Sequence, residues 1–194
     1  MSNTPPENSV FPKDRDEWRA WLVDNYTQDE GIWLIRYKKS AGKPILNFDD
    51  AVEEALCFGW IDSLPRKLDD ERTMLYFAPR KVGSNWSGLN KKRVQKMIDA
   101  GRMTEVGMAK IEVAKADGSW DALNDVENLV VPPDLDEAFA KYPDARANWD
   151  EFPPSARRGI LEWILNAKRD VTRQKRIDET ARLAQENIRA NQWR

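Results

Sequence analysis

The chain has 194 residues, of which 41% are hydrophobic and 33% are charged, and its net charge at pH 7 is −2. This length fits one domain, or one domain with a helical extension, and supplies enough apolar side chains for a core. Histidine is absent and cysteine occurs once, at Cys57. These absences exclude Ser-His-Asp and Cys-His catalytic groups, imidazole or thiolate zinc sites and an intramolecular disulfide. We expect no metal and no cofactor, since only oxygen ligands remain and no calcium-binding loop is present.

Charged residues interrupt every hydrophobic run, so that no run is long and apolar enough to span a bilayer. The first residues, MSNTPPENSVFPKD, lack the charged and apolar regions of a secretory signal. A single cysteine is also typical of a reducing compartment. These features predict a cytoplasmic protein without a transmembrane segment.

The first third of the chain predicts a helix, a strand and a second helix. Residues up to about Pro12 are rich in Pro, Asn and Ser and are expected to be loose. Asp14 then begins a helix with an apolar face around Trp18. The alternation of side chains in residues 31–39 predicts a strand with one mainly buried face. Asn47 can cap the next helix.

The helix after Asn47 carries acidic residues in its first turns and the cysteine on its apolar side. The carboxylates complement the positive end of the helix dipole, which explains them without a metal site. Cys57 lies between Leu56 and Phe58 and is interpreted as an inert core thiol rather than a nucleophile. The acidic residues are Asp49, Asp50, Glu53 and Glu54.

Two short apolar segments, residues 60–68 and 73–81, flank a polar turn and predict a β-hairpin. Pro65 and Pro79 are expected at strand ends, bulges or a sheet edge, because proline donates no backbone hydrogen bond. The sheet is therefore expected to be small and largely antiparallel.

Helices are predicted for the rest of the chain. Ser87 and Thr104 can cap two of them, which end at Gly101 and Gly118. Further helices begin near Asp134 and after the two prolines that precede Ser155. The predicted fold is α+β, with a small antiparallel sheet, surrounding helices and an all-helical C-terminal half. The predicted domains are residues 13–131, an α+β domain with an aromatic-lined hairpin region, and residues 132–194, a helical module packed on it.

Basic residues are concentrated in two places. Seven Lys or Arg side chains stand against Asp99 alone between Arg80 and Arg102, and ten basic residues face five acidic ones from Ser155 to the end. Such segregation can bind phosphate or another anion. The alternative, which we prefer, is a pair of solvated helix faces, because the overall charge is acidic and no nucleic-acid recognition module is present.

The run of aromatic, charged and turn residues from 53 to 90 is the predicted binding region. Trp and Tyr beside Arg dominate recognition sites, because they bury a large area and keep a polar group. A pocket of this kind would hold an aromatic or amphipathic ligand with an anionic or amide group. The alternative is that these aromatic residues are core. The predicted ligand-binding residues are Trp60, Asp62, Arg80, Asn85 and Trp86.

Four phrases of the sequence, taken together, carry a family resemblance. They are AVEEALCFGWIDS (residues 51–63), LDDER (68–72), FAPRKVGSNWS (77–87) and SARRGILEWILNAKRDVTRQKRI (155–177). The chain resembles the YdeI/OmpD-associated family of small bacterial proteins, which are linked to protection against bacteriocins and cationic antimicrobial peptides. Ser63 and Ala78 replace the Gly and Thr usual in that family. The resemblance implies a fold and a physiological setting, and it supplies no catalytic residues.

The predicted function is non-catalytic binding of a small molecule or peptide, in stress or in protection against antimicrobial peptides and bacteriocins. One alternative is an enzyme in which Asp62 acts as acid or base and Arg80 stabilises an anion. A second alternative is weak nucleic-acid binding. No feature of the sequence fixes the oligomeric state.

Overall fold

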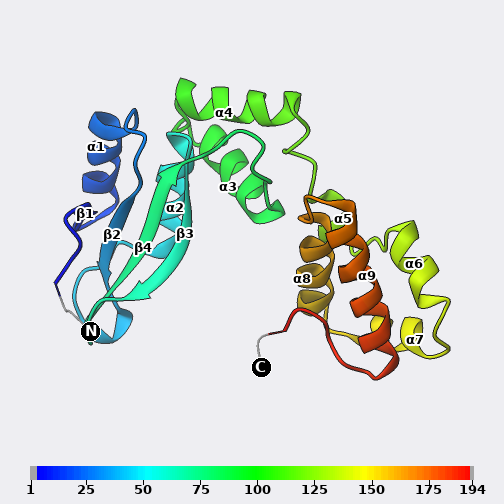
Figure 1. Cartoon of the computed structure of the whole chain (residues 1–194). Coiled ribbons are helices and arrows are strands. Elements are labelled where there is room, and N and C mark those ends of the chain that lie inside the picture. The colour runs from blue at the N-terminus through cyan, green and yellow to red at the C-terminus, as the bar shows by residue number, and fades with distance from the viewer. Residues whose placement is uncertain (1–3, 193–194) are drawn as a thin grey trace. The chain divides into compact units, whose positions relative to one another are not determined.

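The computed structural model describes residues 4–192. The chain divides into two compact units, residues 1–121 (unit 1) and residues 122–194 (unit 2), each with its own core (Figure 1). Unit 1 combines a four-stranded sheet with helices, whereas the described part of unit 2 is all helical. The predicted α+β class is confirmed. No helix within residues 4–192 is long and apolar enough to cross a membrane.

Unit 1 contains both strands and helices, and the four strands form one sheet in the order β1-β2-β4-β3. Its elements in chain order are β1 (Ser9–Val10), α1 (Arg15–Asn25), β2 (Ile32–Tyr37), the 3-10 helix η1 (Lys39–Ala41), α2 (Phe48–Cys57), β3 (Trp60–Lys67), β4 (Arg72–Pro79), α3 (Gly88–Asp99) and α4 (Glu105–Ala116).

The four α-helices of unit 1 begin at the predicted capping residues. In each helix the side chain before the first turn accepts a hydrogen bond from a backbone N–H that has no partner within the helix. The predicted left-handed glycines are also confirmed, since φ is 64° at Gly101 and 81° at Gly118. The four caps are Asp14, Asn47, Ser87 and Thr104.

The sheet contains the predicted hairpin. β3 and β4 pair antiparallel, and β2 pairs antiparallel with the other side of β4. The register of β3 shifts between Asp62 and Pro65. A bulge at this place is consistent with the expectation for Pro65, which cannot donate to a regular ladder.

β1 shows that one expectation was wrong. The residues before Pro12 were expected to be loose, yet Ser9–Val10 pairs parallel with β2. The backbone N–H of Trp33 donates to the carbonyl of Asn8 over 2.9 Å, which ties this segment to the sheet. The sheet is therefore mixed, with one short parallel pair beside two antiparallel pairs.

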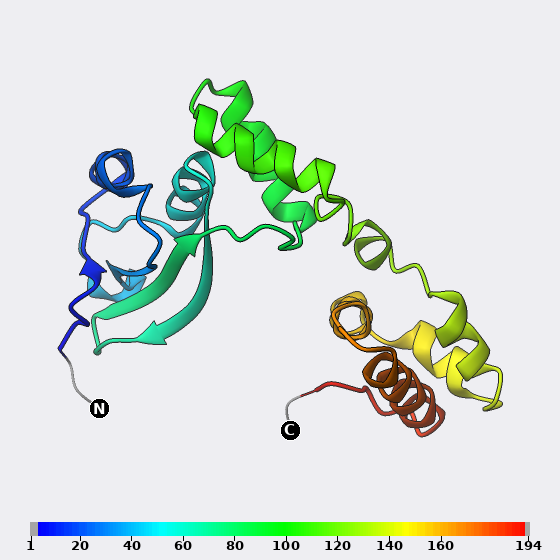
Figure 2. The same cartoon turned by 45° about the horizontal axis from the view of Figure 1, so that its top comes forward.

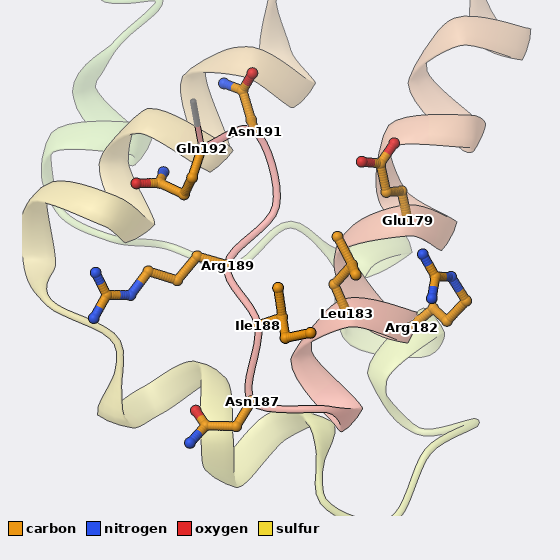
Figure 3. Close-up of a pocket in the computed structure, with 8 residues that line it drawn as sticks. All are labelled: Glu179, Arg182, Leu183, Asn187, Ile188, Arg189, Asn191 and Gln192. Carbon is orange, nitrogen blue, oxygen red and sulfur yellow. The ribbon is translucent and has the colours of Figure 1, made fainter. Parts of the chain in front are cut away.

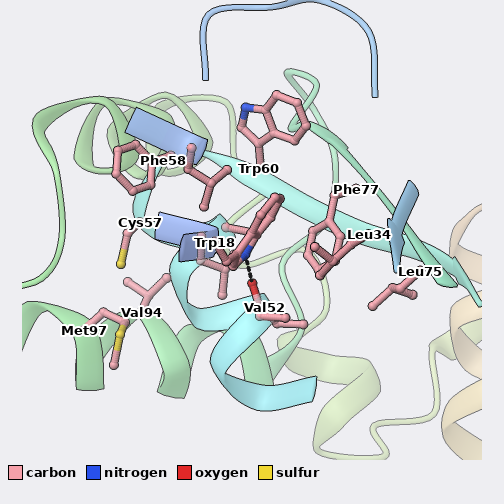
Figure 4. Packing of buried hydrophobic residues seen from close by; sticks show 14 of the residues in the cluster. Trp18, Leu34, Val52, Cys57, Phe58, Trp60, Leu75, Phe77, Val94 and Met97 are labelled. Atoms are coloured by element: carbon pink, nitrogen blue, oxygen red, sulfur yellow. Dashed lines mark hydrogen bonds between the residues drawn. The ribbon is translucent and has the colours of Figure 1, made fainter. Parts of the chain in front are cut away.

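Helices α1 and α2 lie side by side on one face of the sheet (Figures 1 and 2). Between them and the strands, Trp18 is fully buried and its ring centre lies 5.4 Å from that of Phe77. The indole N–H of Trp18 donates to the carbonyl of Ala51 over 3.0 Å, so its polar atom is satisfied inside the core (Figure 4). Burying a side chain of this size contributes about 3 kcal/mol or more to stability.

The opposite face of β2 is also covered. Trp33 and Ile35 are buried in a second cluster with Leu68 and Met74. The expectation of one mainly buried face was therefore wrong for residues 32–35, which are buried on both faces.

α4 approaches the end of α2 closely because of a glycine. A Cβ atom at Gly107 would lie 2.3 Å from the carbonyl oxygen of Cys57, so no larger residue fits. The hydroxyl of Thr104 donates to the same carbonyl. This contact fixes the beginning of α4 next to Cys57.

Unit 2 is a small helical domain built around α9, which contacts α6, α7 and α8. The prolines at the beginning of α6 and α8 occupy positions where a helix needs no N–H donor, as the sequence predicted for α8, whereas α6 begins at Pro133, one residue before the predicted Asp134. Its core contains Leu135, Trp149 and Ile177, all fully buried. Its elements are α5 (Asn124–Glu127), α6 (Pro133–Phe139), α7 (Ala145–Glu151), α8 (Pro154–Leu165) and α9 (Asp170–Gln185).

Candidate functional site

Trp60, the first predicted ligand-binding residue, lies in the core of unit 1. Its side chain is 0% exposed, and its indole N–H donates to the carbonyl of Tyr26 over 3.0 Å. Its ring packs edge-on against Trp21 at 5.8 Å. Trp60 therefore has no exposed face on which a ligand could stack.

Arg80, Asn85 and Trp86 do lie together, as the sequence suggested. The guanidinium of Arg80 lies 3.7 Å from the ring centre of Trp86 and donates to the carbonyl of Asn85. The ring of Trp120 lies 5.0 Å from that of Trp86, which is only 1% exposed. Trp86 is thus covered by protein, and stacking of a ligand on it would require displacement of Arg80 or Trp120.

Arg80 is unusually buried for a charged side chain. Only 5% of its surface is exposed, and burial lowers the pKa of Arg80 to about 10. Within the described residues, its Nε and Nη1 atoms have no hydrogen-bond partner. Such atoms are costly to bury.

Asp62, on β3, makes no hydrogen bond or ion pair with Arg80 or Trp86 that the structure shows, although its charge and that of Arg80 influence each other. Burial raises the pKa of its carboxyl, and the charges of Arg93 and Arg80 oppose that rise in part. The cavity beside Arg80 and Trp86 has a volume of about 10 Å³. This volume matches about one water molecule, so the neighbourhood as it stands has no room for an organic ligand.

A buried group of ion pairs connects α1, α2 and the segment after α3. Glu54 is fully buried and contacts three arginines, Arg15 at 2.5 Å, Arg19 at 2.6 Å and Arg102 at 2.7 Å. Burial alone would raise the pKa of Glu54, but hydrogen bonds from Arg19 and Arg15 outweigh it and hold the pKa below its usual value. Glu53 is buried beside it and pairs with Lys96 at 2.6 Å.

These contacts change the interpretation of the acidic residues in α2. Asp49 and Asp50 lie in the first turn, where the helix dipole favours them. Glu53 and Glu54 lie further along and are placed by basic partners instead, which the sequence analysis missed. The one local signal was the i, i+4 spacing of Arg15 and Arg19 on α1. No group of three or more His, Cys, Asp or Glu within residues 4–192 is arranged to hold a metal ion.

The same contacts neutralise much of the basic stretch between Arg80 and Arg102. A side chain that already has a carboxylate partner contributes less to phosphate binding. Arg80 itself is buried. The ion pairs are Lys91–Asp121, Arg93–Asp49, Lys96–Glu53 and Arg102–Glu54.

An apolar cleft of about 350 Å³, which the sequence did not predict, lies elsewhere in unit 1. We call it the Arg36 cleft. The rings of Phe11 and Tyr37 in its wall meet edge to face at 5.1 Å. Its volume falls within the range of small-molecule sites. The cleft is lined by Phe11, Pro12, Lys13, Arg36, Tyr37, Pro44 and Leu46.

Arg36 is the polar group that distinguishes this cleft. Burial lowers the pKa of its guanidinium, and no carboxylate within residues 4–192 pairs with it. Its Nη1 atom donates to the carbonyl of Leu46 over a long 3.4 Å, while its buried Nε has no partner among the described residues. Lys13, the other cation of the wall, pairs with Glu17 at 3.0 Å. The cleft therefore combines apolar walls with one unneutralised positive charge.

Unit 2 has an open pocket of about 790 Å³ between α9 and the segment that follows it. Figure 3 shows Leu183 and Ile188 at its centre, with Glu179 and Arg182 on α9 and Asn191 on the returning segment. The pocket is shallow and mostly polar. No buried charge lines it, so it offers less to hold a ligand than the Arg36 cleft.

Two family models match the chain. Residues 10–110, which include the first three phrases quoted above, match a domain of unknown function, DUF8412. Residues 128–187, which include the phrase at 155–177, match the family described as bacteriocin-protection, YdeI or OmpD-associated. No curated protein and no solved structure shows significant similarity to the chain. The chain thus carries a DUF8412 domain over residues 10–110 and, over residues 128–187, a domain of the bacteriocin-protection, YdeI or OmpD-associated family.

Proposed function

We propose that the protein binds a small molecule or peptide without catalysing a reaction, and that the Arg36 cleft holds this ligand. The observation that carries the proposal is the guanidinium of Arg36, which is partly buried in an apolar wall and has no carboxylate partner within residues 4–192. An unpaired charge in such a place is unfavourable in the free protein. A bound anion would relieve that cost, so affinity for an anionic group is built into the site.

The walls add a second requirement on the ligand. Phe11, Tyr37 and Leu46 present aromatic and aliphatic surface, which favours an apolar body. The proposed ligand therefore has an apolar part, which fills the cleft, and an anionic group, which contacts Arg36. Charge-assisted hydrogen bonds of this kind are short and directional.

The setting of this binding is part of the proposal. The match of residues 128–187 to the bacteriocin-protection family supports a role in protection against bacteriocins or antimicrobial peptides, or in a related stress response. A cytoplasmic location agrees with a free, buried Cys57.

The proposal can be tested by NMR with 1-anilinonaphthalene-8-sulfonate, a probe with an apolar ring system and one sulfonate. We expect shifts of the backbone amides of Phe11, Tyr37 and Leu46. Arg36→Met should weaken binding about 10-fold or more, because one charge-assisted contact is lost. Lys92→Met is the matched control, since it removes an exposed cation on α3 and should leave affinity unchanged. Shifts confined to other surfaces, or equal loss in both variants, would refute the proposal.

A second candidate function has one observation in its favour. Burial raises the pKa of Asp62, and the charge of Arg80 acts on the same carboxyl, which suits the enzyme alternative, with Asp62 as acid or base and Arg80 as anion stabiliser. We expect Arg80→Met to raise the pKa of Asp62 further, because a nearby positive charge is removed. Carbon-13 NMR titration of the carboxyl measures this directly. An unchanged titration would remove the physical basis for this candidate.

A further inference from the structure

A second hollow of about 730 Å³ adjoins the Arg36 cleft. Both are lined by Arg36 and Tyr37, which form a shared wall. The second hollow has a mixed lining, in which the charged residues Lys38, Asp50 and Lys96 stand beside Ile45 and Phe48. We call it the polar hollow after its charged residues. An apolar cleft and a hollow with charged residues thus meet at one guanidinium.

The charged groups of the polar hollow already have partners, with few exceptions. Asp50 contacts Arg15 at 2.5 Å, and Lys96 contacts Glu53 at 2.6 Å. The ammonium of Lys38 donates to the carbonyl of Asp69 over 2.6 Å. The remaining charges are those of Asp49, which pairs with Arg93, of Lys39, which is exposed, and of Arg36.

Arg36 is therefore the partly buried cation at which a ligand's negative charge is best placed. Lys39 is exposed and keeps its hydration, so an anion gains little from it. The guanidinium of Arg36 is already partly dehydrated by burial, which strengthens its interaction with an anion. Its planar fork also matches the two oxygens of a carboxylate.

We infer that the ligand is the C-terminal residue of a peptide, with an apolar side chain in the Arg36 cleft, its α-carboxylate on Arg36 and the preceding residues in the polar hollow. This inference rests on the proposed function and names its ligand class. A fatty acid would place its chain in the cleft and its carboxylate on Arg36, and it would leave the polar hollow unused. A peptide C-terminus has a group for each place: an apolar side chain for the Arg36 cleft, a carboxylate for Arg36, and a polar backbone for the polar hollow.

The test uses five probes on the full chain, followed by NMR. They are the peptide acetyl-Gly-Ser-Gly-Leu with a free carboxylate, its C-terminal amide, the same peptide ending in Ser, octanoate and free leucine. We expect the first to shift amides in both the cleft and the polar hollow. The amide and the Ser peptide should each bind about 10-fold more weakly or worse, because one loses the charge contact and the other the apolar contact. In Arg36→Met the acid and the amide should bind alike, while Lys92→Met should preserve their difference.

The outcomes separate the inference from the proposed function. If octanoate shifts the cleft and depends on Arg36 while the peptides do not bind, the inference is refuted and the proposed function stands. If free leucine binds as tightly as the peptide, the ligand is an amino acid and the inference is again refuted. If neither octanoate, the sulfonate probe nor any peptide shifts the cleft, both fail. The amide spectrum of Arg36→Met shows independently whether that variant is folded.

Discussion

The two units differ in what they bury. Unit 1 encloses the charged side chains of Glu53, Glu54, Arg80 and Arg93, whereas the buried polar side chain in the described part of unit 2 is that of Thr180. The ion pairs of unit 2 lie nearer the surface and are worth little individually. Unit 1 is thus held by a core that includes charge, and unit 2 by a core that is almost purely apolar.

The segment that matches a described family and the proposed binding site lie in different units. The match to the bacteriocin-protection family covers residues 128–187, in unit 2, while the partly buried Arg36 and its cleft lie in unit 1. The segment that matches this family therefore contains neither the Arg36 cleft nor the buried charged side chains. Experiments on function need to address unit 1 first.

The largest expected difference between the units comes from removing the buried carboxylate of Glu54 in unit 1. Glu54→Gln should lower the free energy of unfolding by about 3–5 kcal/mol, because three arginines lose their shared partner in a buried place. Asp136→Asn in unit 2 breaks the exposed pair with Arg146 and should cost less than about 1 kcal/mol. Urea unfolding of both variants measures the difference. Similar losses in the two variants would show that the units do not differ in this way.

A second prediction concerns the indole of Trp86. Because Trp86 is buried, Trp86→Ala should lower stability by roughly 3 kcal/mol through a cavity, and any change in ligand response should follow unfolding. Thermal melts, together with titration of the sulfonate probe at a temperature where the variant is folded, measure both effects. A melting temperature near that of the natural protein with loss of binding would instead identify Trp86 as a recognition residue.

Acid should affect the same buried charge. The pKa of Glu54 lies below its ordinary value of 4.5, so its contribution to stability is fully present above about pH 4.5. As the pH falls below about 4.5, Glu54 becomes protonated in the unfolded chain while it stays ionised in the folded protein. Its contribution to the free energy of unfolding therefore decreases with falling pH, and it is gone once the pH lies below the pKa of Glu54 in the folded protein. We expect the free energy of unfolding to fall less steeply with acid in Glu54→Gln. Equal slopes in urea melts at several pH values would contradict the account.

The smallest expected effect is at the thiol. Burial raises the pKa of Cys57 to about 11, so little thiolate is present at neutral pH. Labelling by a maleimide should be about 100-fold slower in the native protein than in urea. Mass spectrometry over time follows the reaction. Rapid labelling of the native protein would contradict the burial of Cys57 and favour its role as a nucleophile.

Local chemistry made much of the fold predictable. The four caps of unit 1 were visible in the sequence, because a cap depends on a side chain and a backbone N–H only two or three residues apart. The β3–β4 hairpin followed from a polar turn between two apolar runs for the same reason. β1 was missed, since two residues are too few to show a strand pattern and are held in place by pairing with β2.

The buried ion pairs and the Arg36 cleft could not be predicted, because they are formed by residues that lie far apart in the sequence. Arg15, Arg19 and Arg102 reach Glu54 across 39, 35 and 48 residues, and nothing in the sequence marks such partners. The Arg36 cleft is assembled from three separate segments around Phe11, Arg36 and Leu46.

The role of the tryptophans was equally hidden. Trp60 and Trp86 are as suitable for a core as for a recognition surface, and only tertiary packing decides between the two.

The register shift in β3 has a consequence for how the molecule behaves in a crowded solution. β3 is an edge of the sheet, and a long straight edge would be a template on which other chains could polymerise. Here the edge is interrupted between Asp62 and Pro65, proline offers no donor, and Arg66 and Lys67 place positive charge beyond the interruption. A neighbouring chain would find only a few consecutive backbone groups to pair with on this strand. The irregularity that shapes the hairpin therefore also protects the protein against strand-mediated aggregation.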